Sequence, residues 1–221
     1  MSRLLRVAPS LIALFACAAM AADFVDEETG RQLVDSFVDD ITTFSAGFEQ
    51  VLLDPDGEVL ERTTGTLEIS RPGKFRWSYT EPYEQWLIAD GLNIWSYDVD
   101  LAQVTVKPQA EALANTPALL LGGAEDALDQ FNYEGSYKET VTTWVQLVPK
   151  NTESGFMRVE LGFIDDVLTR MVFFDNLDQT TLVEFNTLAV NTPISPERFE
   201  FLVPDDVDVV GTPAVAGVLP D

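Results

Sequence analysis

The chain has 221 residues, of which 37 are acidic and 13 basic, and its formal net charge of −24 disfavours nucleic acid and anionic lipid headgroups as partners. It contains no histidine, and its only cysteine is Cys17. These absences exclude a histidine general base, a disulfide and a zinc site built from Cys or His, so we predict no enzyme, no metal and no cofactor.

The first 21 residues predict a secretory signal peptide. Arg3 and Arg6 form a positive start, residues 11–18 an apolar run, and residues 19–21 (Ala-Met-Ala) a small-residue cleavage site. The run is shorter than the ~18–20 residues that span a membrane, so residues 22–221 are expected to form one soluble domain in the periplasm. The alternative is lipidation of Cys17, which would anchor the protein to a membrane.

An amphipathic helix is predicted over about 29–42, because Leu33, Val34, Phe37, Val38 and Ile41 recur at helical spacing. After this helix the pattern changes to short β segments separated by turn signals. We expect strands near 45–53, 58–71, 74–80, 85–90, 93–98 and 102–107, two or three short helices within 109–131, further strands at 131–139, 141–148, 156–164, 167–175, 180–190 and 198–203, and a weakly specified tail at 205–221.

Many consecutive antiparallel strands with few helices predict a mainly β fold with some α structure. The expected architecture is an incomplete, unclosed antiparallel β-barrel with a helical lid over an apolar cavity. Its turns are rich in acidic residues, and residues 54–57 (Asp-Pro-Asp-Gly) invite comparison with a calcium loop, while Asp98 with Asp100 and Asp165 with Asp166 invite comparison with glycosidase carboxylates. The calcium spacing is incomplete and each pair lies at a predicted turn, so solvated turns are the better interpretation.

Arg71 is in phase with an apolar row. Leu67 and Ile69 share its strand face by the two-residue period, and Phe75, Trp77 and Tyr79 share one face after the following turn. An unpartnered buried charge is costly, so Arg71 is expected either to meet acceptors such as helix-end carbonyls or to emerge at a rim.

Large aromatic rings concentrate in the first half of the predicted sheet. They are Trp77, Trp86, Trp95, Phe48, Phe75, Tyr79 and Tyr97. Some belong to an ordinary core, but a surplus of rings on one concave sheet also predicts a lipid-binding hollow.

Several segments, in this order, resemble the periplasmic outer-membrane lipoprotein carrier family, LolA. They are residues 48–50 (FEQ), 65–77 (GTLEISRPGKFRW), Pro82, 90–91 (DG), 95–98 (WSYD), 115–117 (NTP), 147–150 (LVPK) and 199–204 (FEFLVP). The match extends over nearly all of residues 22–221.

The resemblance implies a monomeric periplasmic chaperone that receives triacylated lipoproteins from an inner-membrane ABC-type release complex and delivers them to an outer-membrane receptor. It implies that Arg71 latches the lid by bonding helix-end carbonyls near Val38 and near Leu121 and Gly122. The implied ligand-binding residues are Phe48, Leu67, Ile69, Phe75, Trp77, Tyr79 and Trp95 on the sheet, and Leu119 and Leu121 on the inner face of the lid. The alternatives are a membrane-anchored receptor of the same fold, which differs at Cys17, and an enzyme acting on lipids or glycans.

Overall fold

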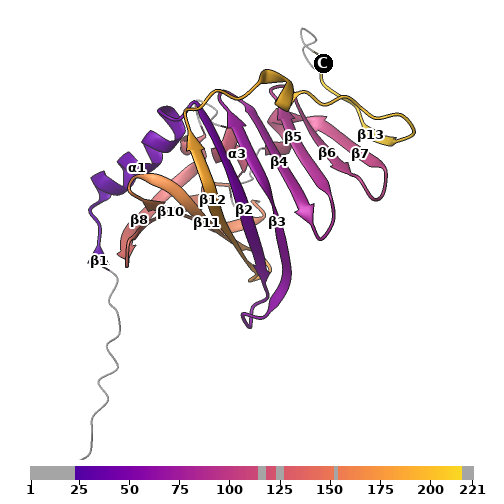
Figure 1. Ribbon diagram of the computed structural model, residues 1–221. Coiled ribbons are helices and arrows are strands. Elements are labelled where there is room, and N and C mark those ends of the chain that lie inside the picture. Colours follow the sequence, from indigo (N-terminus) through magenta and orange to yellow (C-terminus); the bar gives the residue numbers. More distant parts are fainter. Residues whose placement is uncertain (1–22, 114–117, 123–126, 152–153, 216–221) are drawn as a thin grey trace, which may run out of the picture.

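The computed structural model describes residues 23–113, 118–122, 127–151 and 154–215. The predicted signal peptide and Cys17 lie outside these residues. Across the described part the chain forms one strongly curved sheet with helices on its concave side (Figure 1). This is the mainly β architecture with some α structure that the sequence predicts.

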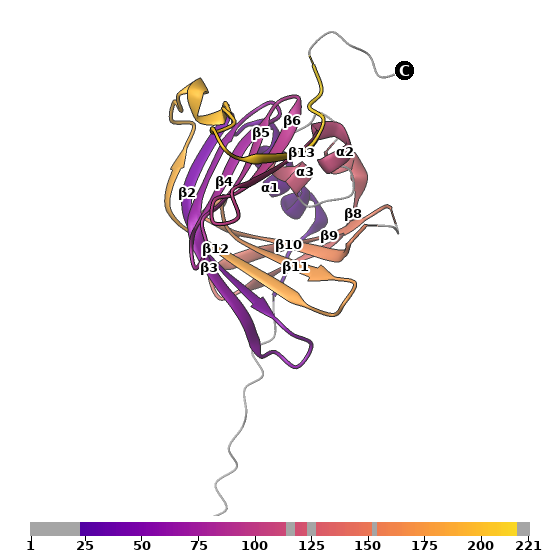
Figure 2. The same ribbon diagram turned by 90° about the vertical axis from the view of Figure 1, so that its right-hand side faces the viewer.

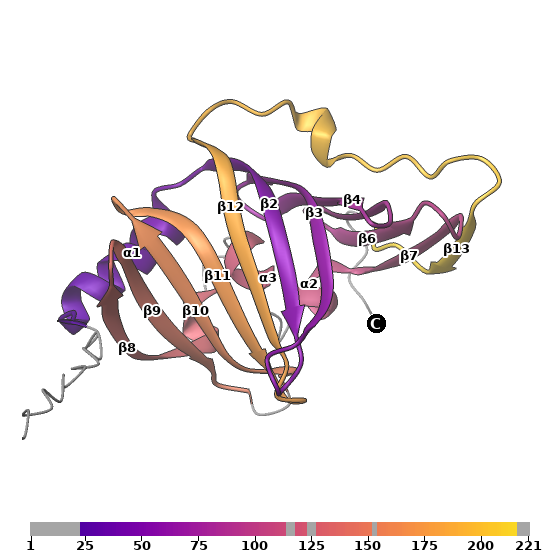
Figure 3. The same ribbon diagram turned by 60° about the horizontal axis from the view of Figure 1, so that its bottom comes forward.

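The sheet has thirteen strands in the order β1-β8-β9-β10-β11-β12-β2-β3-β4-β5-β6-β7-β13. Neighbouring strands are antiparallel except for β13, which runs parallel to β7. The sheet does not close, because β1 and β13 form separate edges that lie far apart (Figure 3). The bounds are β1 Asp23–Phe24, β2 Thr43–Leu53, β3 Val59–Ser70, β4 Lys74–Glu81, β5 Gln85–Asp90, β6 Asn93–Asp98, β7 Gln103–Pro108, β8 Phe131–Glu139, β9 Thr142–Pro149, β10 Phe156–Ile164, β11 Val167–Asp175, β12 Thr180–Val190 and β13 Asp208–Gly211.

Three α-helices lie inside the curve of the sheet (Figure 2). α1 (Glu27–Asp39) packs on β8 and β9, α2 (Gln109–Leu113) on β6 and β7, and α3 (Ala118–Gly122) on β3 and β4. Two 3₁₀ turns, η1 (Leu128–Gln130) and η2 (Pro196–Phe199), complete the described helices. We call α1, α2 and α3 together the lid.

α1 begins and ends where local hydrogen bonds replace those of a continuing helix. The side chain of Asp26 accepts a bond of 3.0 Å from the backbone N–H of Thr29 and caps the amino end. At the other end the side-chain oxygen of Asn191 accepts a bond of 2.8 Å from the N–H of Thr42, which turns the chain into β2. The helix predicted over 29–42 therefore lies two to three residues earlier in the chain, at Glu27–Asp39.

The two-residue period of the strands makes the concave face apolar beneath the lid. In β2, β3 and β4 the buried inward side chains include Phe44, Phe48, Leu67, Ile69 and Phe75. β9 to β12 continue this face with Val145, Leu147, Val159, Leu161, Phe163, Met171, Val183 and Phe185, all of which belong to the same core cluster. The lid packs against this surface.

Two predictions for the carboxyl-terminal region are wrong. The expected strand at 198–203 is η2 followed by irregular chain, and its rings pack on the convex face instead of pairing: Phe199 is buried and Phe201 lies 5.4 Å from Trp95. The expected tail contains β13, whose residues 208–211 pair with residues 103–106 of β7. Alternating aromatic residues bury equally well in an extended segment, so the pattern did not distinguish it from a strand.

Candidate functional site

An apolar cavity of ≈ 410 Å³ lies between the concave face and the lid. Its lining comprises Gln50, Trp77, Tyr79, Leu87, Ile94, Ala112, Leu113, Leu121, Phe156, Phe173 and Thr181. None of these side chains carries a charge. A concave, mostly apolar hollow with a few polar groups is the usual form of a site for a small apolar ligand.

Apart from Trp95, the predicted ligand-binding residues with described side chains lie at different depths around this cavity. Trp77, Tyr79 and Leu121 line it directly. Phe48 is buried directly behind this lining, with its ring centroid 5.1 Å from that of Trp77. The remaining sheet residues, Leu67, Ile69 and Phe75, are fully buried in the core cluster that the lid covers, and the side chain of Leu119 lies outside the described residues.

Trp95 is not part of the cavity, contrary to the prediction. Its neighbour Ile94 faces the cavity, so the two-residue period turns Trp95 to the convex face. There its Nε1 donates a bond of 2.7 Å to Asp90 and its ring packs on Phe201. Trp86 and Tyr97 lie on the same convex side, and their ring centroids are 5.4 Å apart.

Arg71 joins the lid to the end of β3. The strand ends at Ser70, and the guanidinium of Arg71 donates bonds of 2.7 Å from Nη1 to the carbonyls of Phe37 and Ile41 and of 3.2 Å from Nη2 to the carbonyl of Leu120. The guanidinium carbon Cζ of Arg71 lies 4.6 Å from the ring centroid of Phe37, which is a cation–π contact. Burial lowers the pKa of Arg71 to about 10, so the group stays charged at neutral pH.

The carbonyls that Arg71 bonds lie one to three residues from the positions named in the prediction. Phe37 and Ile41 take the place of Val38, and Leu120 takes the place of Leu121 and Gly122. The carbonyl of Gly122 instead accepts the backbone N–H of Gly73, at 2.8 Å, in the β3–β4 turn.

Gln109, which the sequence analysis did not single out, fastens α2 to the same end of the sheet. Its Nε2 donates a bond of 2.6 Å to the carbonyl of Gly73, and its Oε1 accepts a bond of 3.1 Å from the N–H of Gly91. No local sequence signal marks such a residue, because its two partners lie in turns far away along the chain. Leu87 was missed for a related reason, since only the register of β5 against β4 places it beside Trp77. Phe156 and Phe173 were missed because only the curvature of the sheet brings β10 and β11 to the same cavity as β4.

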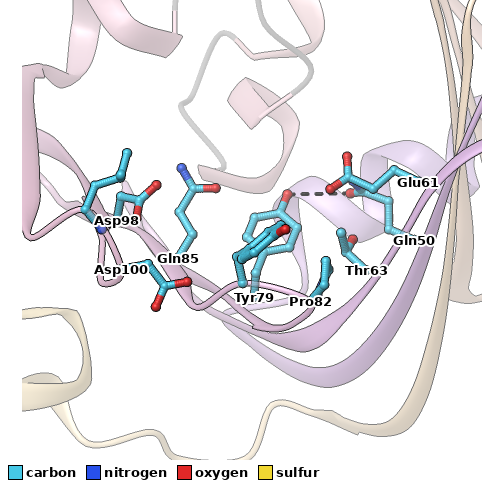
Figure 4. A pocket seen from close by; sticks show the side chains of 10 residues that line it. Gln50, Glu61, Thr63, Tyr79, Pro82, Gln85, Asp98 and Asp100 are labelled. Atoms are coloured by element: carbon cyan, nitrogen blue, oxygen red, sulfur yellow. Dashed lines mark hydrogen bonds between the residues drawn. The ribbon is translucent and has the colours of Figure 1, made fainter.

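A second hollow of ≈ 460 Å³, whose lining includes three carboxylates, adjoins the cavity (Figure 4). It is lined by Gln50, Glu61, Thr63, Tyr79, Pro82, Tyr83, Gln85, Asp98, Asp100 and Leu101, and we call it the mouth hollow. Gln50 and Tyr79 line both spaces, and the hydroxyl of Tyr79 donates a bond of 3.5 Å to Gln50 between them. Burial raises the pKa of Tyr79 to about 12, so this hydroxyl remains a donor.

The described residues contain no cluster of three or more His, Cys, Asp or Glu side chains suited to a metal ion. No helix among them has both the length and the apolar character needed to cross a bilayer. The acidic turns behave as expected of turns: Asp54 accepts the N–H groups of Asp56 and Glu58, and Asp98 accepts that of Leu101.

Comparison with known proteins points to one family. Residues 39–202 match the family model described as outer membrane lipoprotein carrier protein LolA. An outer-membrane lipoprotein carrier protein of Methylobacillus flagellatus is 37% identical over 209 residues, covering 95% of this chain and 99% of the relative. One from Methylococcus capsulatus is 41% identical over 183 residues, covering 83% and 88%. A solved structure of an uncharacterized conserved protein from Thermus thermophilus, with a TM-score of 0.52, 16% identity and coverage of 83% and 97%, shares the fold.

Proposed function

This chain belongs to the outer membrane lipoprotein carrier family LolA, and on that premise we propose that it is a periplasmic chaperone for triacylated lipoproteins. It takes its cargo from an ABC-type release complex of the inner membrane and passes it to a receptor at the outer membrane. The acting part is a single domain, residues 22–221, left after removal of a signal peptide. It is a monomer and carries out no catalysis.

The observation that supports this proposal is an uncharged cavity beneath a lid that one half-buried arginine holds in place. Acyl chains gain ~0.8 kcal/mol per buried CH₂, so a single 16-carbon chain stores roughly 12 kcal/mol. Such a chain therefore leaves the protein for water too slowly to account for delivery. Delivery therefore requires a receptor that offers equal or better burial while the two proteins are in contact.

The closed cavity is too small for the whole lipid. At ≈ 410 Å³ it lies near the lower limit of sites for drug-sized ligands, whereas a triacylated lipoprotein carries three long chains. Loading therefore requires the lid to move away from the concave face, which enlarges the space and uncovers the core residues Leu67, Ile69 and Phe75. The described structure, in which Arg71 bonds both α1 and α3, corresponds to the closed form.

In this proposal Arg71 sets the balance between the two forms. An empty open cavity exposes a large apolar surface, and the bonds from Arg71 to Phe37, Ile41 and Leu120 hold it closed. Cargo breaks these bonds on entry, and the protein regains them on discharge. The latch consequently lowers net affinity by the free energy of those bonds and favours transfer to the receptor.

Native mass spectrometry of the protein purified from periplasm tests the proposal. We expect a fraction of the molecules to carry an acylated lipoprotein in one-to-one complex, with an unmodified protein amino terminus after the signal peptide. An acylated Cys17 on a membrane-bound protein would establish the alternative, a receptor of the same fold. Purified protein that never carries or accepts an acylated ligand would contradict both.

A further inference from the structure

The mouth hollow and the apolar cavity are adjoining compartments that differ in charge: three carboxylates line the first, and no charged side chain lines the second. Both are bounded by Gln50 and Tyr79, so a ligand that fills the cavity with apolar chains continues directly into the mouth hollow. The mouth hollow lies beside the β4–β5 and β6–β7 turns, which contribute Pro82, Asp100 and Leu101 (Figure 4). It is therefore placed to receive whatever polar group the chains are attached to.

An unused hydrogen-bonding group marks this compartment as a binding site. Thr63 is only 8% exposed, yet its hydroxyl finds no hydrogen-bond partner anywhere in the described ranges. Buried polar groups are nearly always bonded, so such a hydroxyl indicates a partner that arrives with the ligand. Thr63 lies directly across the strand pair from Gln50, and together with Tyr79 these side chains offer donors and acceptors to the carbonyl and amide groups of an acylated cysteine.

The charges of the mouth hollow are all negative. Glu61, Asp98 and Asp100 line it, no basic side chain does, and none of the three forms an ion pair within the part of the chain that the structure describes. The glyceryl ester, thioether and amide groups of a triacylated cysteine carry no charge, so they do not compensate these carboxylates. The next part of the cargo to pass them is the peptide that follows the cysteine.

We propose that the mouth hollow binds the glyceryl-cysteine head and the first peptide residues of the cargo, and that Glu61, Asp98 and Asp100 make it favour basic over acidic residues at those positions. This specificity rests on the proposed carrier function. Acidic residues directly after the acylated cysteine meet like charges at short range, which disfavours binding, whereas basic residues gain ion pairs. The cavity supplies affinity for the chains, and the mouth hollow distinguishes one cargo from another.

The test uses two synthetic triacylated peptides that differ only after the acylated cysteine, Ser-Lys-Lys in one and Ser-Asp-Asp in the other. Octanoyl chains keep both below the concentration at which they aggregate. Binding to the full-length mature protein is measured by tryptophan fluorescence. We expect the basic peptide to bind about five- to tenfold more tightly, the effect of one or two exposed ion pairs. The preference should be present at about 0.01 M salt and nearly absent at about 1 M, because salt screens exposed charges.

The net charge of −24 would by itself favour a basic peptide, so two variants with equal charge separate the local effect from the global one. Glu61→Gln, Asp98→Asn and Asp100→Asn together neutralise the mouth hollow. The control neutralises Glu139, Asp165 and Asp166, which lie in or beside the β8–β9 and β10–β11 turns at the other end of the strands.

Loss of the preference in the mouth variant, with retention in the control, supports the proposal. Equal affinity of the unaltered protein for the two peptides overturns it and leaves the carrier function intact, as does an equal loss of preference in both variants. If neither peptide binds, the carrier function itself fails, and the proposal with it.

Discussion

Replacing Arg71 by leucine tests the latch most directly. The change removes all three guanidinium bonds, two to the lid and one to Ile41 just after α1, while keeping an apolar side chain of moderate size at the end of β3. The carbonyls of Phe37, Ile41 and Leu120 then lose their donor in the closed form and recover partners from water when the lid opens. The substitution therefore favours the open form in two ways.

The magnitude follows from the number of bonds. Hydrogen bonds to a charged group contribute about 1.5–3 kcal/mol each, and the two terminal nitrogens of Arg71 make three of them, two sharing Nη1. Burial of the guanidinium, which also lowers its pKa, offsets part of this gain. A net latch of about 2–4 kcal/mol corresponds to a shift of roughly 30- to 900-fold in the opening equilibrium.

Hydrogen–deuterium exchange measures that shift. Amides in α3 and in the β3–β4 turn, including the Gly73 N–H bonded to Gly122, should exchange faster in Arg71→Leu by a factor in this range. Loading from inner-membrane vesicles should proceed normally, whereas transfer to the receptor should fall, because the open form has lost its competitor for the ligand.

The matched control is Arg62→Leu. Arg62 is exposed, and its Nη1 lies 3.1 Å from Oε1 of Glu49; neither residue lines the cavity. An exposed ion pair of this kind contributes no more than about 1 kcal/mol to stability. Exchange in the lid and transfer to the receptor should both remain close to those of the unaltered protein. If the lid amides exchange at the same rate in Arg71→Leu and Arg62→Leu, the latch is refuted. It is also refuted if Arg71→Leu is defective only in loading.

Three further predictions concern the cavity wall, the sheet and the amino terminus. Trp77→Glu should weaken binding of a fluorescent fatty amphiphile at least about tenfold, because it places a carboxylate without a partner in an apolar wall. Gly65→Ala should lower the free energy of unfolding in urea by about 2 kcal/mol or more, since the added Cβ would overlap the carbonyl of Ser78 and come within 2.8 Å of the Phe48 ring. Mass spectrometry of protein released by osmotic shock should give a mature chain that starts at Ala22.

Each of these has its own control. Trp86→Glu puts the same carboxylate on the convex face beside the guanidinium of Arg76, which lies 4.5 Å from the Trp86 ring centroid, and should leave binding unchanged. If Trp77→Glu folds and binds as tightly as Trp86→Glu, Trp77 does not contact the ligand. Gly155→Ala meets no atom within 4 Å, so a destabilisation equal to that of Gly65→Ala would contradict the steric argument. Recovery only in detergent, with lipid on Cys17, would exclude an unanchored chaperone.

The sequence determined the class of fold because that class depends on local patterns. Turn residues such as Asp54 to Gly57 and the two-residue alternation of Phe75, Trp77 and Tyr79 act within a few residues of each other. The same alternation identified the inward face of β4 and brought Arg71 into phase with it. These features needed no knowledge of the partner strands.

Face and partner choice depended on the assembled sheet. Trp95 has the large apolar side chain expected of a cavity residue, but the register of β6 against β5 turns it to the convex face, where it packs under Phe201. Phe201 itself appeared to belong to a strand because an extended segment packed on a sheet and a strand paired within one bury the same side chains. β13 was missed because it is a short edge strand and its partner, β7, is about a hundred residues earlier in the chain.

By itself the sequence therefore determined a β-rich chain without histidine, with an apolar strand face and one arginine in phase with it. Only the tertiary structure decided which carbonyls that arginine bonds, which rings line the cavity, and that Gln50 and Tyr79 separate an apolar space from an acidic one. The physical reason is that backbone periodicity is a local property, whereas each of these contacts joins segments that are brought together by sheet curvature, strand register and the placement of the lid.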